Sequence, residues 1–233
     1  MAADGAHVSL LVDAWDAFQA NEGWQRVGEH VRLSVVPLAI AGAIGLVLGV
    51  ACAKGGPVGS FVVSTTGIAG RLIPTFAAMA LVMALSSVGF WPAVVGLTLL
   101  GIPPVLLNVA AGIQHADPGA VEAARGMGFT GAQVLRTVEL PLAVPFVFTG
   151  LRTAAVMIVS TAALAGAIGA GGLGVTIIAG FSNNQDDVLL SGAIPVTLLA
   201  LAAEGILVAL QRLITPTGLR RSRRQARLTG RNA

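Results

Sequence analysis

The chain has 233 residues, of which 55% are hydrophobic and only 11% carry a charge. A water-soluble domain carries roughly 25% charged residues, so this composition excludes an ordinary soluble domain and favours a membrane protein. The net charge of +3 does not indicate a nucleic-acid partner, because the arginines cluster behind the last apolar segment and no nucleic-acid-binding motif accompanies them.

Several apolar segments approach the roughly 20 residues that a helix needs to cross a bilayer. We therefore predict an all-α polytopic membrane protein with about five transmembrane helices in one permease-type domain over 31–212. The second predicted helix is the least regular, because 58–70 is rich in Gly, Ser and Thr and could begin as an interfacial stretch. The predicted spans are 31–53, 62–86, 90–112, 141–167 and 188–211.

The charge distribution predicts the orientation in the membrane. Acidic residues dominate 1–30, whereas arginines dominate 213–233. Because basic segments stay on the cytoplasmic side, we expect an extracytoplasmic N-terminal segment (1–30) and a basic cytoplasmic tail (213–233) that could also contact membrane lipid. Lys54 and the polar loop 117–140 then lie inside, and 183–187 lies outside.

The loop 117–140 has the composition of two short helices. Asp117 can cap a helix that starts with Pro118 and runs over about 118–126. Glycines at 126 and 128 then allow a tight reversal. Thr130 and Gln133 have the spacing of a capping box, which predicts a second short helix that Pro141 closes before the next span begins.

This loop resembles the EAA signature of permease subunits of binding-protein-dependent ABC importers, with a methionine-importer-like fold. The family usually has Ile where this chain has Val138. The resemblance implies a coupling helix that docks on a cytoplasmic ABC ATPase subunit, which binds ATP-Mg, and it also implies a solute-binding protein and a second permease copy or paralogue. The residues implied in coupling are Glu122, Ala123, Ala124, Gly128, Val138 and Pro141.

The segments 126–154, 169–174 and 192–204 resemble the osmoprotectant subfamily, which imports glycine betaine, proline betaine, choline or carnitine. Aromatic cages bind such quaternary ammonium groups, but this chain has no Tyr and only 5% aromatic residues, so we expect the cage on the binding protein. A methionine or other amino-acid importer permease remains an alternative. A channel-like or scaffolding membrane protein without an ATPase is the alternative from another class.

Other motifs do not indicate catalysis, and we expect no enzymatic activity and no cofactor in this chain. No P-loop sequence occurs, so ATP must be hydrolysed by a separate subunit. The histidines are scattered and Cys52 is alone, which predicts no metal site. A G-x-G-x-x-G pattern follows an apolar helix rather than a strand, and the family resemblance implies an outer-mouth turn there, formed by Gly169, Gly171, Gly172 and Gly174.

Charged residues within predicted spans are costly in lipid and usually face a partner or a cavity. Arg152 lies ~16 Å along its helix from Pro141, and Glu204 lies ~12 Å from Arg212, at ~1.5 Å per residue. These similar depths predict an Arg152–Glu204 ion pair that braces the fourth and fifth spans.

Further residues are candidates for the translocation path. Arg71 and Pro74 resemble the family's start of the second span, and Pro74 predicts a kink that often lines a cavity. Asn108 either bonds a neighbouring helix or lines the path. Gly45 and Gly49 form a small-xxx-small pair, which predicts close helix packing.

Overall fold

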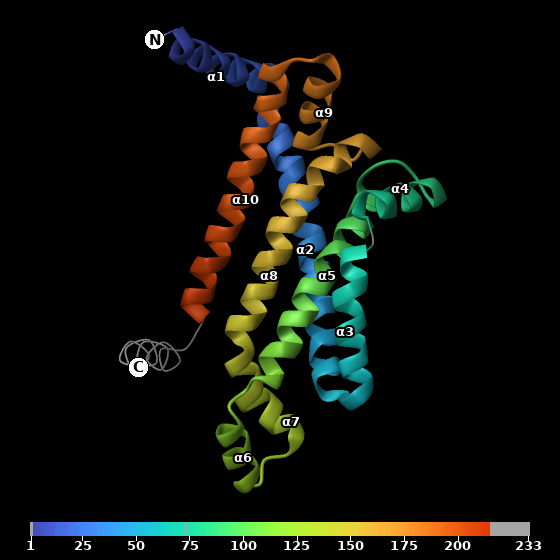
Figure 1. Ribbon diagram of the computed structural model, residues 1–233, viewed down its shortest axis with the longest axis vertical. Coiled ribbons are helices and arrows are strands. Elements are labelled where there is room, and N and C mark those ends of the chain that lie inside the picture. The colour runs from blue at the N-terminus through green and yellow to red at the C-terminus, as the bar shows by residue number, and fades with distance from the viewer. Residues whose placement is uncertain (1, 73, 215–233) are drawn as a thin grey trace.

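The computed structural model describes the backbone of residues 2–72 and 74–214, and the side chains of residues 9–68 and 74–214. Every regular element in these ranges is a helix (Figure 1). In chain order they are α1 (Ala2–Ala20), α2 (Gly23–Lys54), α3 (Gly56–Leu72), α4 (Thr75–Leu85), α5 (Phe90–Gln114), α6 (Pro118–Gly126), α7 (Gly131–Val134), the π-helical turn η1 (Leu135–Glu139), α8 (Leu140–Ala162), the 3₁₀ turn η2 (Ala163–Ile168), α9 (Leu173–Asn183) and α10 (Asp186–Ile214).

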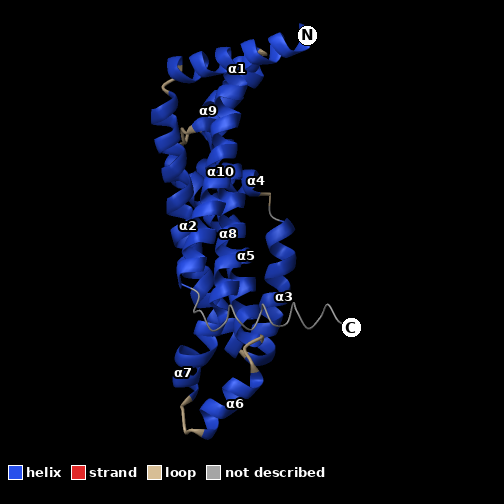
Figure 2. Cartoon of the chain, turned by 90° about the vertical axis from the view of Figure 1, so that its left-hand side faces the viewer, coloured by secondary structure: helices blue, strands red, loops and turns tan. Residues whose placement is uncertain are grey.

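Among the described residues, 4 helical segments are long and apolar enough to cross a membrane. They are α2, α5, the continuous segment Gly131–Ile168 and α10, and they confirm the first, third, fourth and fifth predicted spans. Figures 1 and 2 show them running along the long axis, with α1 across one end and α6 and α7 at the other. The first spanning helix, α2, starts at Gly23 rather than near residue 31, so part of the predicted N-terminal segment belongs to this helix.

The second predicted span is wrong as a single helix over 62–86. It is divided into α3, which lies beside α2 and α5, and the shorter α4, which projects to the side of the bundle near the upper end of α3 (Figure 1). Pro74 has an extended backbone with φ −67° and ψ 114° directly before α4. Proline disfavours helical geometry in the residue before it, so the kink predicted at Pro74 becomes a complete break.

The core of the bundle is the packing of α5 between α2 and α8. A Cβ atom added to Gly45 of α2 would lie 2.7 Å from Cβ of Val105, and one added to Gly49 would lie 2.6 Å from Cβ of Val109. On the opposite side, a Cβ added to Gly150 of α8 would lie 2.9 Å from the carbonyl oxygen of Pro104. The close packing predicted for Gly45 and Gly49 is therefore confirmed, and small residues set the helix separation.

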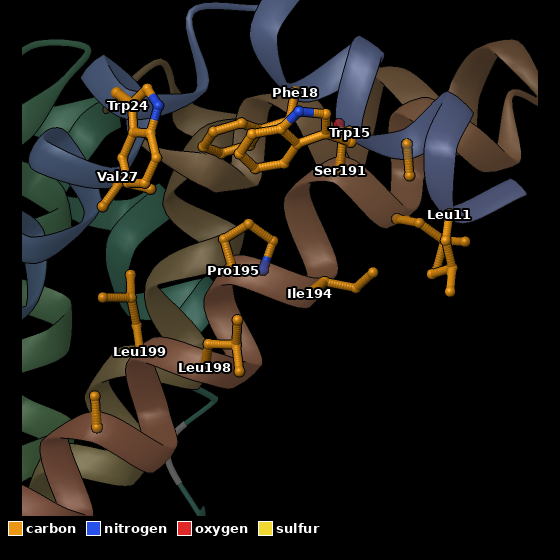
Figure 3. A pocket seen from close by; sticks show the side chains of 13 residues that line it. Leu11, Trp15, Phe18, Trp24, Val27, Ser191, Ile194, Pro195, Leu198 and Leu199 are labelled. Atoms are coloured by element: carbon orange, nitrogen blue, oxygen red, sulfur yellow. The ribbon is translucent and has the colours of Figure 1, made fainter. Parts of the chain in front are cut away.

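The helix α1 was not expected from the sequence. It contacts α2 and α10, and its Phe18 ring packs against Trp15 and Trp24 with centroid separations of 5.6 and 5.4 Å. Together the three helices border an apolar groove of about 470 Å³ (Figure 3). Aromatic side chains of this kind favour the membrane–water interface, which fits a helix lying across the end of the spans.

The glycine contacts between α2 and α5 can be tested with matched alanine substitutions. Gly45→Ala inserts a methyl group where no space exists, and overpacking of this kind costs about 1–3 kcal/mol. Gly205 of α10 has open space around it, so Gly205→Ala should leave thermal stability in detergent unchanged or raise it. Equal melting temperatures for the two variants would contradict the packing described here.

Candidate functional site

The polar loop folds as the sequence predicts over most of its length. Asp117 caps α6, and its Oδ1 accepts a hydrogen bond of 2.8 Å from the Ala120 N–H. The capping box is also present: the Thr130 N–H donates to Oε1 of Gln133 at 2.7 Å, and the Gln133 N–H donates to Oγ1 of Thr130 at 3.4 Å. These caps satisfy the backbone groups at both helix starts and give the loop a defined shape.

The reversal between α6 and α7 depends on one of the two glycines. Gly128 has φ +84°, whereas Gly126 is the last helical residue of α6 and has no positive φ. The Phe129 N–H donates to the Ala124 carbonyl at 3.1 Å and closes the turn. A side chain at Gly128 would be strained in this backbone conformation, so the turn requires glycine there.

The residues predicted to couple do not all face outward. Glu122, Ala123 and Gly128 are exposed, Val138 and Pro141 are half-buried, and Ala124 is buried. A coupling role for these six residues stays a prediction, but Ala124 lies on the inward side, because α6 packs against α7 and η1. Met127 and Phe129 are exposed instead, and the sequence analysis missed them.

The second loop helix does not end at Pro141. Its residues continue through η1 into α8, with the Leu140 N–H donating to the Leu135 carbonyl in a π-type turn. Pro141 lies in the first turn of α8 and lacks an N–H, which a helix start tolerates. The loop is therefore joined to α8 without a flexible connection, and π turns of this kind often occur at functional sites.

An ion pair that the sequence analysis missed connects this junction to α2. Nζ of Lys54, at the end of α2, lies 2.5 Å from Oε2 of Glu139 in η1. The Glu139 residue is only 4% exposed, so its carboxylate requires a compensating charge. The sequence predicted only that Lys54 lies on the same side of the membrane as the loop, and this did not identify Glu139 as its partner.

The predicted Arg152–Glu204 pair is confirmed. Nε of Arg152 donates to Oε1 of Glu204 at 2.8 Å, and Nη2 donates to the same oxygen. Nη1 also donates to Oε1 of Gln211 at 3.4 Å, a contact that the sequence did not predict. The pair joins α8 to α10, and its side chains remain 32% and 35% exposed in this chain.

The other candidates for the translocation path are less closely grouped. The Asn108 amide donates to the Pro104 carbonyl of its own helix at 2.8 Å, so this bond is not the interhelical one that was considered. Pro74 is exposed at the start of α4. The Arg71 backbone belongs to α3, but its side chain lies outside the described residues. A path role for these residues stays a prediction.

The glycine-rich turn interrupts the helix after α8, as predicted. Gly169, Gly171 and Gly172 have φ values of 71°, 84° and 75°, and Gly174 is the second residue of the next helix, α9 (Leu173–Asn183). Figure 1 places this turn at the opposite end of the bundle from α6. One residue that the sequence did not indicate holds it: Oε2 of Glu29 accepts from the Gly172 N–H at 2.8 Å. The next residue, His30, contacts α8 instead, with its Nε2 3.0 Å from the Val159 carbonyl oxygen.

The fold and the loop together define a class of protein. A bundle of helices long and apolar enough to span a membrane, with a capped helical loop at one end, is the architecture of a polytopic membrane protein. Residues 45–216 match the family described as "Binding-protein-dependent transport system inner membrane component", and the chain belongs to that family.

Curated relatives and solved structures agree with this assignment. The chain is 34% identical over 194 residues to the glycine betaine/carnitine/choline transport system permease protein OpuCB of Bacillus subtilis, covering 83% of this chain and 89% of that protein. It is 35% identical over 201 residues to the osmoprotectant import permease protein OsmW of Salmonella typhimurium, covering 82% and 91%. An inward-facing structure of the MetNI methionine ABC transporter superposes with a TM-score of 0.72 at 25% identity, covering 82% and 94%.

Membership of this family has direct consequences for the chain. It is a transport component of a bacterial inner membrane, crosses the membrane several times and is not an enzyme. The family implies an ATPase subunit, where ATP is used, and a solute-binding protein as partners.

A double-mutant cycle tests the Arg152–Glu204 pair. Arg152→Gln or Glu204→Gln alone should destabilise the purified protein, because each leaves one charge without its partner. The double variant should recover part of the loss, with a coupling free energy of about 0.5–3 kcal/mol in thermal unfolding. Strictly additive losses would show that the two side chains do not interact.

Proposed function

We propose that this chain is the permease subunit of an ABC importer for a compatible solute of the glycine betaine, proline betaine, choline or carnitine type. The observation that carries the proposal is the 34% identity, over most of both chains, to a relative named for glycine betaine, carnitine and choline transport. The similarity to a methionine transporter is lower, at 25% identity, and supports the shared fold more than the shared solute. Family membership also disfavours a channel or scaffold.

The loop between α5 and α8 is the proposed contact for the ATPase. Its exposed residues include Glu122, Ala123, Met127 and Phe129, whereas Ala124 is buried on the inward side of α6. Because the loop continues through η1 into α8, a displacement of the loop moves α8 as well. The Lys54–Glu139 pair would transmit part of the same displacement to α2.

The proposed assembly contains two permease chains, two ATPase subunits that bind ATP-Mg, and one solute-binding protein. One chain contributes too few helices to enclose a path, so a second copy or a close paralogue would complete it. We propose the loop end as cytoplasmic and the α1 end as extracytoplasmic, since Lys54, Arg125 and Arg136 gather at the loop end. The basic segment 215–233 lies outside the described residues.

Uptake measurements test the solute class. A strain that lacks this chain should lose import of radiolabelled glycine betaine and regain it on complementation. Excess choline or carnitine should compete, because they share the quaternary ammonium group, whereas methionine should not. Competition by methionine, without competition by choline or carnitine, would instead favour a permease of an amino-acid importer.

Paired substitutions test the coupling loop. Gly128→Asp should reduce copurification with the ATPase and abolish uptake, because Gly128 has φ +84° and cannot accept a side chain without strain. Gly126→Asp adds the same charge two residues away. A Cβ atom added there would meet no other packed group within 4 Å, and the backbone is helical, so most uptake should remain. An intact complex and full uptake in the Gly128 variant would refute a coupling role for this turn.

A further inference from the structure

The lipid-compatible surfaces of the bundle are easily recognised. On α2, the exposed side chains include Val35, Ile44 and Val47, and on α10 they include Leu201 and Ile206. These faces are aliphatic at the depth of the spans, as contact with hydrocarbon requires.

The exposed face of α8 has a different character. Thr149, Thr153 and Ser160 are all exposed, and with Met157 they follow helical spacing along one side. The opposite side of the helix is buried, at Gly150, Ala154 and Ile158 among others. We call Thr149, Thr153 and Ser160 the hydroxyl stripe.

The hydroxyl stripe has defined hydrogen-bonding properties. Oγ1 of Thr149 donates to the Pro145 carbonyl at 2.9 Å, and Oγ1 of Thr153 donates to the Thr149 carbonyl at 3.0 Å. The hydroxyl hydrogens of both threonines are therefore used inside the helix, and their oxygen lone pairs remain available as acceptors toward the exposed side.

The neighbouring edge of α10 continues this polar surface. Thr197 is exposed, and Glu204 and Gln211 follow it at intervals of seven residues, on the side that meets Arg152. The Arg152 and Glu204 side chains are still 32% and 35% exposed in this chain. Exposure of an ion pair to hydrocarbon is costly, so this surface requires a polar environment.

We propose that the hydroxyl stripe, with the Arg152–Glu204 pair beside it, borders the water-filled path of a quaternary ammonium solute, an inference that rests on the proposed function. Hydroxyl oxygens attract a trimethylammonium group only weakly, which allows the solute to move on. The ion pair presents one group of each sign, which suits a zwitterion such as glycine betaine. The aliphatic faces of α2 and α10 then meet lipid.

Cysteine modification of the complete transport complex in proteoliposomes tests this assignment. The probe is the trimethylammonium-ethyl methanethiosulfonate cation, which reacts with thiolates that water can reach. Thr149→Cys, Thr153→Cys and Ser160→Cys are small changes, made in a Cys52→Ala background that must itself transport. We expect modification about tenfold faster than at the control Val47→Cys, with a rate that changes when vanadate traps the ATPase.

Val47 is a matched control because Gly45 of α2 and Gly150 of α8 both pack against Val105, which places Val47 and Thr149 at similar depth. Val47 is 67% exposed on an aliphatic face. Modification of the stripe cysteines no faster than of Val47→Cys would overturn the proposal. Oxidative cross-linking of Thr153→Cys between two copies would also overturn it, because the stripe would then be a dry interface between two permease chains.

A second measurement does not depend on cysteine chemistry. Thr149→Val with Thr153→Val preserves side-chain shape and removes both hydroxyl oxygens, so glycine betaine uptake should fall severalfold while the complex copurifies normally. Unchanged uptake would count against the proposal. Rapid modification of the stripe cysteines, combined with no glycine betaine uptake by the unmodified complex, would support the water-filled path and reject the proposed solute class. The two proposals can therefore fail separately.

Discussion

The close contact of α2 with α5 is the constraint on which the rest of the structure depends. Gly45 and Gly49 bring the two helices so near that an added methyl group would overlap Val105 or Val109. Gly150 brings α8 equally near to the other side of α5. Because lipid offers no hydrophobic driving force for helix association, such close van der Waals packing supplies much of the cohesion.

This core gives α2 a position from which it contacts both ends of the bundle. Near its start, Glu29 accepts a hydrogen bond from the Gly172 N–H of the glycine-rich turn. At its last residue, Lys54 pairs with the buried Glu139 where the loop joins α8. One helix thus contacts both the loop junction at one end of the bundle and the glycine-rich turn at the other.

Polar side chains within the spans differ in where they find hydrogen-bond partners. Arg152 and Glu204 satisfy each other across α8 and α10, and Gln211 adds a further acceptor. Asn108 instead bonds the Pro104 carbonyl within its own helix and packs near Gly150. Each arrangement avoids an unpaired polar group in hydrocarbon, which would cost several kcal/mol.

The helical membrane class, four of the spans and the caps of the loop could be predicted from the sequence alone, because hydropathy and capping act through nearby residues. The Arg152–Glu204 pair was also predictable, since helical rise converts residue number into depth. Tertiary packing instead decided that Ala124 faces inward and that Lys54 meets Glu139. Those outcomes depend on how helices distant in sequence pack, and local patterns carry no information about that.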